Sequence, residues 1–317
     1  MLAFAVRKLA IALITLLGVS IIAFFLMRVV PGDTIDAQLG QFYTEQRAEQ
    51  MRAELGLDAP VVVQYGRWLA GAVQGDLGES IYYRKPVTEA IAQRLPVTLE
   101  LAALALLLAI VVGVPLGVLA AMRRGGVVDY LCSSIGVLGV SVPAFWLATL
   151  LILGFAYYGS ALPSGGFVSI GRDPVANLRH MLLPTLALGA AVAAVIIRMT
   201  RSSMLEVLGQ DYVRTARAKG VGRGRVVARH ALRNALVPVL TIIGIQAGYL
   251  LGGSVVIEMV FNLPGVGWAA YKAATERDYL LLQGVILLIA FGFVTINLIV
   301  DLLYGWVDPR MRRKGAA

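Results

Sequence analysis

The sequence is short of cysteine, histidine and charged residues, and each shortage excludes a class of protein. Cys132 is the only cysteine, which excludes an internal disulfide framework. The two histidines leave little for a metal cage. Charged residues make up 15% of the chain, whereas an average globular chain has about 25%. No segment matches the Walker A motif, so any ATP hydrolysis must come from another polypeptide.

Apolar residues are in excess, at 58% of the 317 residues with a mean hydropathy of +0.77. A soluble domain of this length could not bury so much apolar surface, whereas a lipid bilayer solvates it. Several runs come near the ~20 residues that a transmembrane helix needs. These six runs are Leu9–Val30, Pro96–Ala121, Leu131–Tyr158, Met181–Met199, Val237–Ile257 and Leu280–Tyr304. The sequence therefore predicts an all-α membrane protein with six transmembrane helices.

Two features refine this prediction. Pro143 interrupts the third run, where we expect a kink or a break. Arg7 and Lys8 precede the first run, as they would in a signal peptide. That run is too long for the apolar core of a signal peptide and lacks a small-residue cleavage site. We therefore expect it to remain as the first span.

The distribution of basic residues predicts the orientation of the chain. With the N-terminus inside, the inner segments hold Arg123 and Arg124, the strongly basic segment 201–236, and the C-terminal arginines from Arg310 onward. The outer basic residues are spread through longer loops, and acidic residues offset them in the first of these loops. The positive-inside rule then places both termini in the cytoplasm.

Small residues recur at helical spacing in three of the runs. Gly244, Gly248 and Gly252 fall nearly on one face of the fifth run. Gly113 and Gly117 repeat this spacing in the second run, and the fourth run has the alanines Ala187, Ala190, Ala191 and Ala194. Missing side chains let membrane helices approach closely. We favour packing within one bundle over a subunit interface.

Polar residues inside the runs are few, and Gln246, Asn297 and Asp301 stand out, with Glu258 at the outer end of the fifth run. An intramembrane acid should face a partner or water, because burying its charge is costly. For Asp301 a buried pair with an arginine is the simpler interpretation, and a role in the permeation path is the alternative.

The segment 201–236 contains a short predicted helix. Asp211 suits the N-cap position and Gly220 the position after the C-cap. Tyr212, Val213 and Ala216 share one face of this helix. Such a short helix is marginal in water by itself, so we expect a partner to pack against that face. A second helix is predicted from near Arg223.

This segment resembles the signature "EAA" loop of permease subunits in ABC importers. Thr215-Ala216-Arg217 stand where the family has Glu-Ala-Ala, so only the middle alanine is kept, and Leu236-Val237-Pro238 close the loop. The form YVRTARAKG is similar to the dipeptide, oligopeptide, glutathione and nickel branch. Further matches in order are Pro31-Gly32-Asp33, Leu55 to Asp58, Gln64-Tyr65, Gly75 to Gly78, Pro96-Val97-Thr98, Leu251 to Ser254, Phe261-Asn262, Pro264 to Gly267, and Asn297 through Asp301 to Asp308-Pro309-Arg310.

The resemblance implies a type I ABC importer permease in the bacterial inner membrane. The expected partners are a second homologous permease, two ATP-binding subunits and a periplasmic substrate-binding protein. ATP and Mg would be used by the ATPase subunits, with no cofactor, metal or catalytic residue on this chain. The divisions are then an N-terminal transmembrane helix at 1–30, a periplasmic loop region at 31–95, a permease core at 96–305 and a cytoplasmic tail at 306–317.

The resemblance implies one set of site residues, and the few polar residues in and near the runs supply a second. The ATPase-docking coupling helix would comprise Asp211, Tyr212, Val213, Arg214, Thr215, Ala216, Arg217, Ala218, Lys219 and Gly220. Candidates for the translocation path or outer gate are Gln246, Tyr249, Glu258, Asn262, Asn297 and Asp301.

Three alternatives remain at this point. A nickel or other small-solute permease belongs to the same branch, although two surface-proximal histidines argue mildly against a metal path. A stand-alone secondary transporter or channel would need paired broken helices in two repeats, and only the break at Pro143 is found. An intramembrane hydrolase lacks a serine motif and a histidine at mid-depth. A peptide or glutathione is the favoured substrate.

Overall fold

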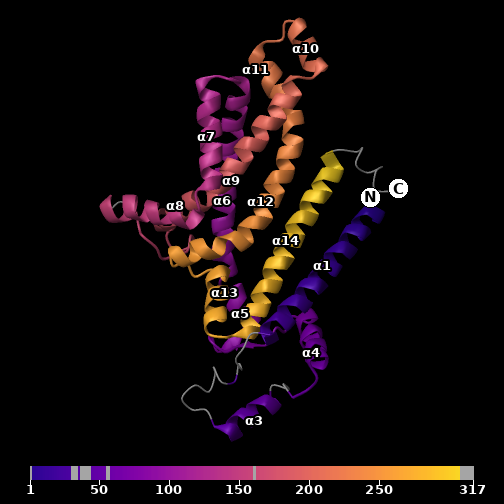
Figure 1. The fold of residues 1–317 in the computed structure, drawn as a ribbon, viewed down its shortest axis with the longest axis vertical. Coiled ribbons are helices and arrows are strands. Elements are labelled where there is room, and N and C mark those ends of the chain that lie inside the picture. Colours follow the sequence, from indigo (N-terminus) through magenta and orange to yellow (C-terminus); the bar gives the residue numbers. More distant parts are fainter. Residues whose placement is uncertain (1, 30–34, 36–43, 55–57, 160–161, 308–317) are drawn as a thin grey trace. The chain divides into compact units, whose positions relative to one another are not determined.

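The computed structural model describes residues 2–29, 35, 44–54, 58–159 and 162–307 (Figure 1). The described chain is mostly helical, with one short antiparallel pairing of Glu79 with Pro86 and of Ser80 with Lys85. The elements are α1 (Leu2–Val29), α3 (Glu45–Glu54), α4 (Val61–Val73), β1 (Glu79–Ser80), β2 (Lys85–Pro86), α5 (Val87–Ala92), α6 (Leu95–Met122), α7 (Val127–Ser141), α8 (Ala144–Leu151), η2 (Ile152–Tyr158), α9 (Pro174–Leu208), α10 (Asp211–Ala218), α11 (Arg223–Arg225), η3 (Val226–Ala231), α12 (Leu232–Val260), α13 (Val266–Thr275) and α14 (Tyr279–Val307).

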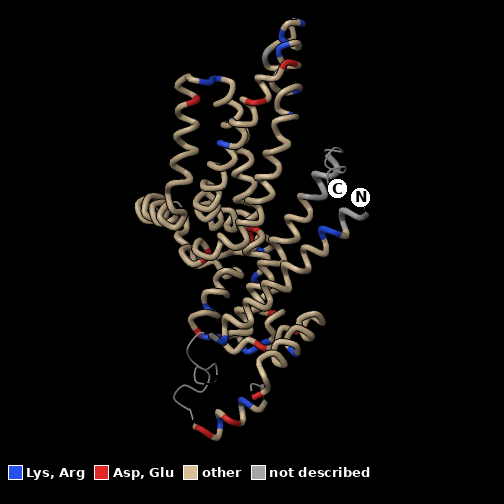
Figure 2. Tube along the Cα trace, turned by 45° about the vertical axis from the view of Figure 1, so that its right-hand side comes forward, with Lys and Arg blue, Asp and Glu red and all other residues tan. Residues whose placement is uncertain are grey.

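The described parts of all six predicted apolar runs are helical, with the third run interrupted at Val142 and Pro143. Among the described residues, five helices are long and apolar enough to cross a membrane, and α7 with α8 forms a sixth, broken candidate. Charged residues are sparse along the long helices and gather near their ends and in the connecting segments (Figure 2). A further short helix, α3, covers Glu45–Glu54 in the segment after the first run.

The break at Pro143 is confirmed. α7 ends at Ser141, Val142 and Pro143 are extended, and α8 starts at Ala144 after a bend of 102°. Proline has no N–H to donate and disfavours helical dihedrals in the residue before it, so the helix cannot run through this site.

The chain forms two compact units, Met1–Thr98 with Pro264–Leu298 and Gly305–Ala317, and Leu99–Leu263 with Ile299–Tyr304. In the second unit α9 packs against α7, α8 and α12. A Cβ at Gly117 would lie 2.6 Å from Thr200 and 2.8 Å from the Ile197 carbonyl, and one at Gly139 would lie 2.7 Å from Ala194. At these positions the small residues let helices of the second unit approach closely, as expected for α6 and α9, and Gly139 of α7 adds a contact that the sequence analysis did not single out. We call α6, α7 and α9 the helix stack.

In the first unit, an aromatic group joins α4 to α1. The rings of Tyr65 and Trp68 lie 5.2 and 5.7 Å from that of Phe24, and the Ser20 and Tyr65 hydroxyls are 2.8 Å apart. A separate apolar cluster joins α5, α13 and the start of α14, with fully or nearly fully buried residues Val87, Ala90, Ile91, Val266, Ala273, Leu281 and Val285.

Candidate functional site

The short helix α10 lies between the long helices α9 and α12 in the chain, and its start differs from the prediction. Asp211 is not the N-cap but the first helical residue. Gln210 takes the cap position with extended dihedrals, and its carbonyl accepts from the backbone N–H of Val213 and Arg214 at 3.1 and 3.3 Å. The carbonyl of the residue before Asp211 thus begins the helix, and the Asp211 carboxylate instead lies 3.6 Å from Arg214. An acid in the first turn still suits the helix dipole.

The end of α10 is as predicted. Gly220 has φ +79, its N–H donates to the Arg217 carbonyl at 2.9 Å, and the N–H of Val221 donates to the Ala216 carbonyl at 3.2 Å. These paired bonds form a Schellman motif, which needs a left-handed residue and so favours glycine. The helix therefore stops at a defined place.

The apolar face of α10 packs on its own chain. Val213 is fully buried, Ala216 is half-buried, and α10 contacts η3 and α9. The Tyr212 hydroxyl accepts from the Asn234 amide at 2.8 Å and lies 3.4 Å from the His230 carbonyl. The expectation that an outside partner must cover this face is therefore wrong in part, because Val213 is already buried within the chain, where α10 contacts η3 and α9.

The other side of α10 is open and basic. Its exposed residues after the first turn are Arg214, Thr215, Arg217, Ala218 and Lys219. Because Val213 and Tyr212 anchor the helix, these side chains are held on a fixed support. Such a surface can present positive charge and one small apolar side chain to a partner.

The predicted path residues in α12 differ in environment. Gln246 is half-buried, and Tyr249 is 57% exposed. Glu258 is fully buried near the end of the helix, and the Ser254 hydroxyl donates to its carboxylate at 3.0 Å.

The local backbone conformation explains why an asparagine stands at position 262. It has φ +51, its N–H donates to Met259, and the N–H of Leu263 donates to the Glu258 carbonyl at 2.8 Å. Asn262 thus ends α12 as Gly220 ends α10, and asparagine is the usual alternative to glycine there.

The structure gives less information on the two candidate path residues in α14. The Asn297 amide donates to the Phe293 carbonyl of its own helix at 3.0 Å. Asp301 belongs to α14, and its side chain lies outside the described residues. Pro31 to Asp33, Leu55 to Leu57 and Asp308 to Arg310 likewise lie outside them.

The glycines of α12 do not share one environment. Gly244 and Gly248 are buried, and a Cβ at Gly244 would clash with the side chain of Val300 of α14. Gly252 is exposed.

Sequence reasoning missed an ion pair between α7 and α9. The Arg201 guanidinium donates to both carboxylate oxygens of Asp129 at 2.5 and 2.9 Å. Asp129 is nearly fully buried and also accepts from the N–H of Gly125 at 2.9 Å. This bidentate pair fixes the turn between α6 and α7. The signal available in the sequence was an unexplained acid beside an apolar run.

A second missed group centres on Asp278, which is fully buried before α14. Its carboxylate accepts from the Ser80 hydroxyl at 2.5 Å and from the N–H groups of Tyr82 and Leu281, both at 3.1 Å. We call Ser80, Tyr82, Asp278 and Leu281 the Asp278 hub. Ser80 and Asp278 are 198 positions apart, so no local pattern could reveal the contact.

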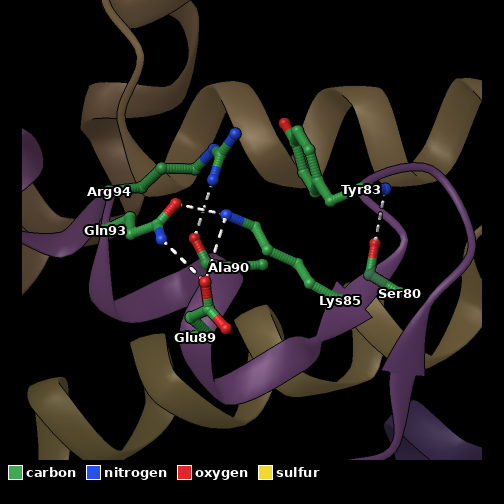
Figure 3. Close-up of polar contacts among 7 residues, drawn as sticks. All are labelled: Ser80, Tyr83, Lys85, Glu89, Ala90, Gln93 and Arg94. Carbon is green, nitrogen blue, oxygen red and sulfur yellow. Dashed lines mark hydrogen bonds and ion pairs between the residues drawn. The ribbon is translucent and has the colours of Figure 1, made fainter.

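Further polar contacts surround the same hairpin (Figure 3). Lys85 donates to Gln93, the N–H of Tyr83 donates to Ser80 at 3.1 Å, and the Arg94 guanidinium lies 3.7 Å over the Tyr83 ring. Burial raises the pKa of the Tyr83 hydroxyl, and the Arg94 charge opposes that rise.

Solved structures share this fold. An inward-facing structure of the MetNI methionine ABC transporter has a TM-score of 0.57 at 20% identity and covers 68% of this chain and 95% of that one. An amino acid ABC transporter with histidines has a TM-score of 0.54 at 15% identity, covering 68% and 94%. The fold is therefore that of a type I ABC importer permease.

Two family models match the sequence. Residues 113–313 match the binding-protein-dependent transport system inner membrane component, and residues 1–102 match the N-terminal part of such components. The chain belongs to this family of inner-membrane permease components. It is a multi-pass inner-membrane protein and one component of a transport system, consistent with no enzymatic role of its own.

Curated relatives match the chain nearly end to end. The dipeptide transport system permease protein DppB of Escherichia coli (strain K12) is 41% identical over 338 aligned positions, which cover 99% of this chain and all of DppB. A Brucella abortus (strain 2308) protein, provisionally named as a peptide transport system permease, is 45% identical over 312 positions, covering 98% and 99%.

Proposed function

We propose that this permease forms half of the translocation path of an ATP-driven importer for a peptide-type substrate, which is a dipeptide, an oligopeptide or glutathione. The names of the relatives support the substrate class, since DppB is a dipeptide permease and is 41% identical over the whole chain. The second half of the path comes from a homologous permease, and a periplasmic binding protein delivers the substrate.

The coupling role belongs to α10. The observation that carries it is the anchored geometry: Val213 and Tyr212 fix the helix to its own chain while Thr215 and Ala218 stay exposed. A helix held in this way transmits a movement of the ATPase subunits to the helix bundle, and a movement of the bundle to the ATPase subunits. Two ATPase subunits would dock on such helices, hydrolyse ATP with Mg, and drive the bundle between inward-facing and outward-facing states.

The orientation follows from the same assignment. With α10 in the cytoplasm, both termini lie in the cytoplasm, and the segment 31–95 and the α12–α13 turn at Asn262 face the periplasm. The basic character of 201–236 supports this arrangement through the positive-inside rule.

The docking test places a charge on the open face of α10. Ala218→Glu should prevent co-purification of the ATPase subunits in mild detergent while leaving membrane insertion intact. Ala92→Glu, at an exposed alanine that ends the short helix α5, is the matched control and should retain the ATPases. Ala218 is a cleaner site than Ala216, which is half-buried in the chain. Full ATPase recovery with Ala218→Glu would remove α10 from the docking surface.

The substrate test measures uptake of a labelled dipeptide by cells that carry or lack this permease, with unlabelled tripeptide, glutathione and Ni²⁺ as competitors. Competition by peptides or glutathione supports the proposal. If cells that carry this permease take up Ni²⁺ but no peptide or glutathione, and cells that lack it do not take up Ni²⁺, the nickel-transporting alternative of the same branch is favoured.

A further inference from the structure

A cavity of about 240 Å³ lies beside α10 within the second unit. Its lining comes from the ends of α6 and α9, the α6–α7 turn, α10 and η3, and consists of Ala121, Met122, Arg124, Leu205, Leu208, Gly209, Arg217 and Val227. This volume is below the roughly 300–1,000 Å³ of pockets for drug-sized ligands. The cavity therefore suits a small chemical group that is one part of a larger ligand molecule.

The floor of the cavity is apolar. Ala121 and Val227 belong to a buried cluster with Met204, Ala231 and Ala235, against which Met122, Leu205 and Leu208 pack. A ligand there would contact methyl and methylene groups on its inner side, so part of the ligand must itself be apolar.

The polar lining carries charge of one sign. Arg124 and Arg217 are exposed, and neither guanidinium group has a hydrogen-bond or ion-pair partner among the described residues. No acidic side chain lines the cavity. Of the acids near this lining, Asp129 and Asp211 are already paired with Arg201 and Arg214, and Glu206 of α9 is an exposed residue that does not line the cavity. Two uncompensated guanidinium groups at the rim of one cavity favour an anion, and their fork geometry suits phosphate.

The backbone at both arginines is held in place before any ligand binds. Arg124 lies in a turn where Gly125 has φ +74 and donates to the buried Asp129. Arg217 is in the last turn of α10, and its carbonyl is part of the Schellman motif. Little ordering of the backbone is needed on binding, which favours affinity.

The depth of the cavity points to the membrane surface. α6 has 28 residues, which at 1.5 Å per residue gives about 42 Å. A bilayer with its headgroups is about 40–45 Å thick. Because α6 crosses the membrane, its last residues, Ala121 and Met122, fall at the level of the headgroups.

We infer that this cavity binds the phosphate of an anionic phospholipid, with Arg124 and Arg217 on the phosphate and the apolar floor against the start of the acyl chains. Basic pockets between transmembrane helices at this level are known to suit such headgroups. An occupied site would tie the α6–α7 turn to α10. The inference does not depend on ATPase docking, and its readout is lipid binding.

The test measures phosphatidylglycerol bound to the purified transporter in a neutral detergent by native mass spectrometry. Each of Arg124→Gln and Arg217→Gln should weaken binding about fivefold, and the double variant about 25-fold, as expected for losing one or two surface charges. Arg123→Gln and Arg214→Gln remove the same charge from neighbouring positions outside the lining and should leave affinity within about twofold of the parent. Arg217→Lys, which keeps the charge, should retain most of the binding.

Two further arms identify the source of the phosphate. Phosphatidylcholine should bind far more weakly than phosphatidylglycerol, and inorganic phosphate at millimolar concentration should not displace the lipid. Displacement by inorganic phosphate through the same two arginines would replace the lipid by a soluble phosphate as the occupant. Equal weakening in all four single variants, or equal binding of phosphatidylcholine, would overturn the site.

Discussion

The helix stack and the Asp278 hub are stabilised in opposite ways. In the stack, α9 approaches α6 and α7 where side chains are missing, as at Gly113, Gly117 and Gly139. In the hub, one buried carboxylate accepts three hydrogen bonds from the β1–β2 turn and from the start of α14. Close packing between complementary helix surfaces stabilises the helix stack, and hydrogen bonds to one buried carboxylate stabilise the Asp278 hub.

The difference follows from the solvent around each region. Lipid chains are as apolar as leucine, so hydrophobic burial cannot drive membrane helices together and close packing must do so. The β1–β2 turn contains backbone groups without helical partners, and each such buried group needs a hydrogen bond. Five predictions test this comparison.

The largest loss is expected at the hub. Asp278→Ala leaves the Ser80 hydroxyl and the N–H groups of Tyr82 and Leu281 without their acceptor. Each unsatisfied buried donor costs about 1–3 kcal/mol, so about 4 kcal/mol of the free energy of unfolding should be lost. Asp278→Asn keeps acceptor oxygen and should lose about half as much. Thermal unfolding in detergent measures both, and an unchanged midpoint for Asp278→Ala would refute the role of the hub.

The stack should respond to added volume rather than to lost polarity. At Gly117 a Cβ would lie 2.6 Å from Thr200 and 2.8 Å from a backbone oxygen, so the helices must move apart. Gly117→Val should destabilise the chain by about 3 kcal/mol. Gly18→Val in α1, where nothing lies within 4 Å, is the control and should change stability much less. Similar unfolding midpoints for the two variants would show that close approach does not hold the stack.

Asp129 and Arg201 form a polar contact inside the stack and so sharpen the comparison. Asp129→Asn removes the charge from the bidentate pair and should cost about 2 kcal/mol, because the Arg201 guanidinium loses its counter-ion. A double-mutant cycle with Arg201→Gln measures the coupling between the two side chains. A coupling energy near zero would make the pair incidental, and the stack would then depend on shape alone.

Substitutions at Asn262 distinguish an effect of its backbone conformation on stability from an effect of its side chain on transport. At φ +51, Asn262→Gly should stabilise the chain by up to about 1 kcal/mol, and Asn262→Val should destabilise it by about 1 kcal/mol or more. Stability is measured by unfolding, and transport is measured in parallel. Normal uptake with Asn262→Gly would assign this residue to the helix end, whereas loss of uptake in a stable protein would support a role in the gate.

The smallest effect is expected at Tyr83, beside the hub. Burial raises its pKa above the ordinary value of 10.0, so the neutral hydroxyl is favoured in the folded state. This contribution is present below about pH 10 and is lost as the pH rises through the folded-state pKa. The hydroxyl oxygen is buried without a hydrogen-bond partner, so Tyr83→Phe should be nearly neutral at pH 8. It should also reduce the loss of stability between about pH 9 and 11, measured by unfolding across that range. A pH profile identical to that of the parent protein would contradict this assignment.

Sequence patterns predicted the elements whose causes are local. Apolar run length identified the six spanning segments, Pro143 located the break, and Gly220 located the end of α10. The cap of α10 was misplaced by one residue, because Gln210 provides the first carbonyl and an acidic side chain is acceptable on either side of the helix start. The burial of Val213 within the chain was also missed, since η3 and α9 reach α10 only through the path of the folded chain.

By itself, the sequence determined the helices, the break and the family likeness of the α10 segment, because all three depend on neighbouring residues. Tertiary structure decided which polar groups meet. Asp278 reaches Ser80 across 198 positions, Arg201 reaches Asp129 across 72, and the cavity with Arg124 and Arg217 draws on five separate elements. Hydrogen bonds and ion pairs act over a few ångströms, so they depend on the path of the folded chain rather than on the spacing of residues along it.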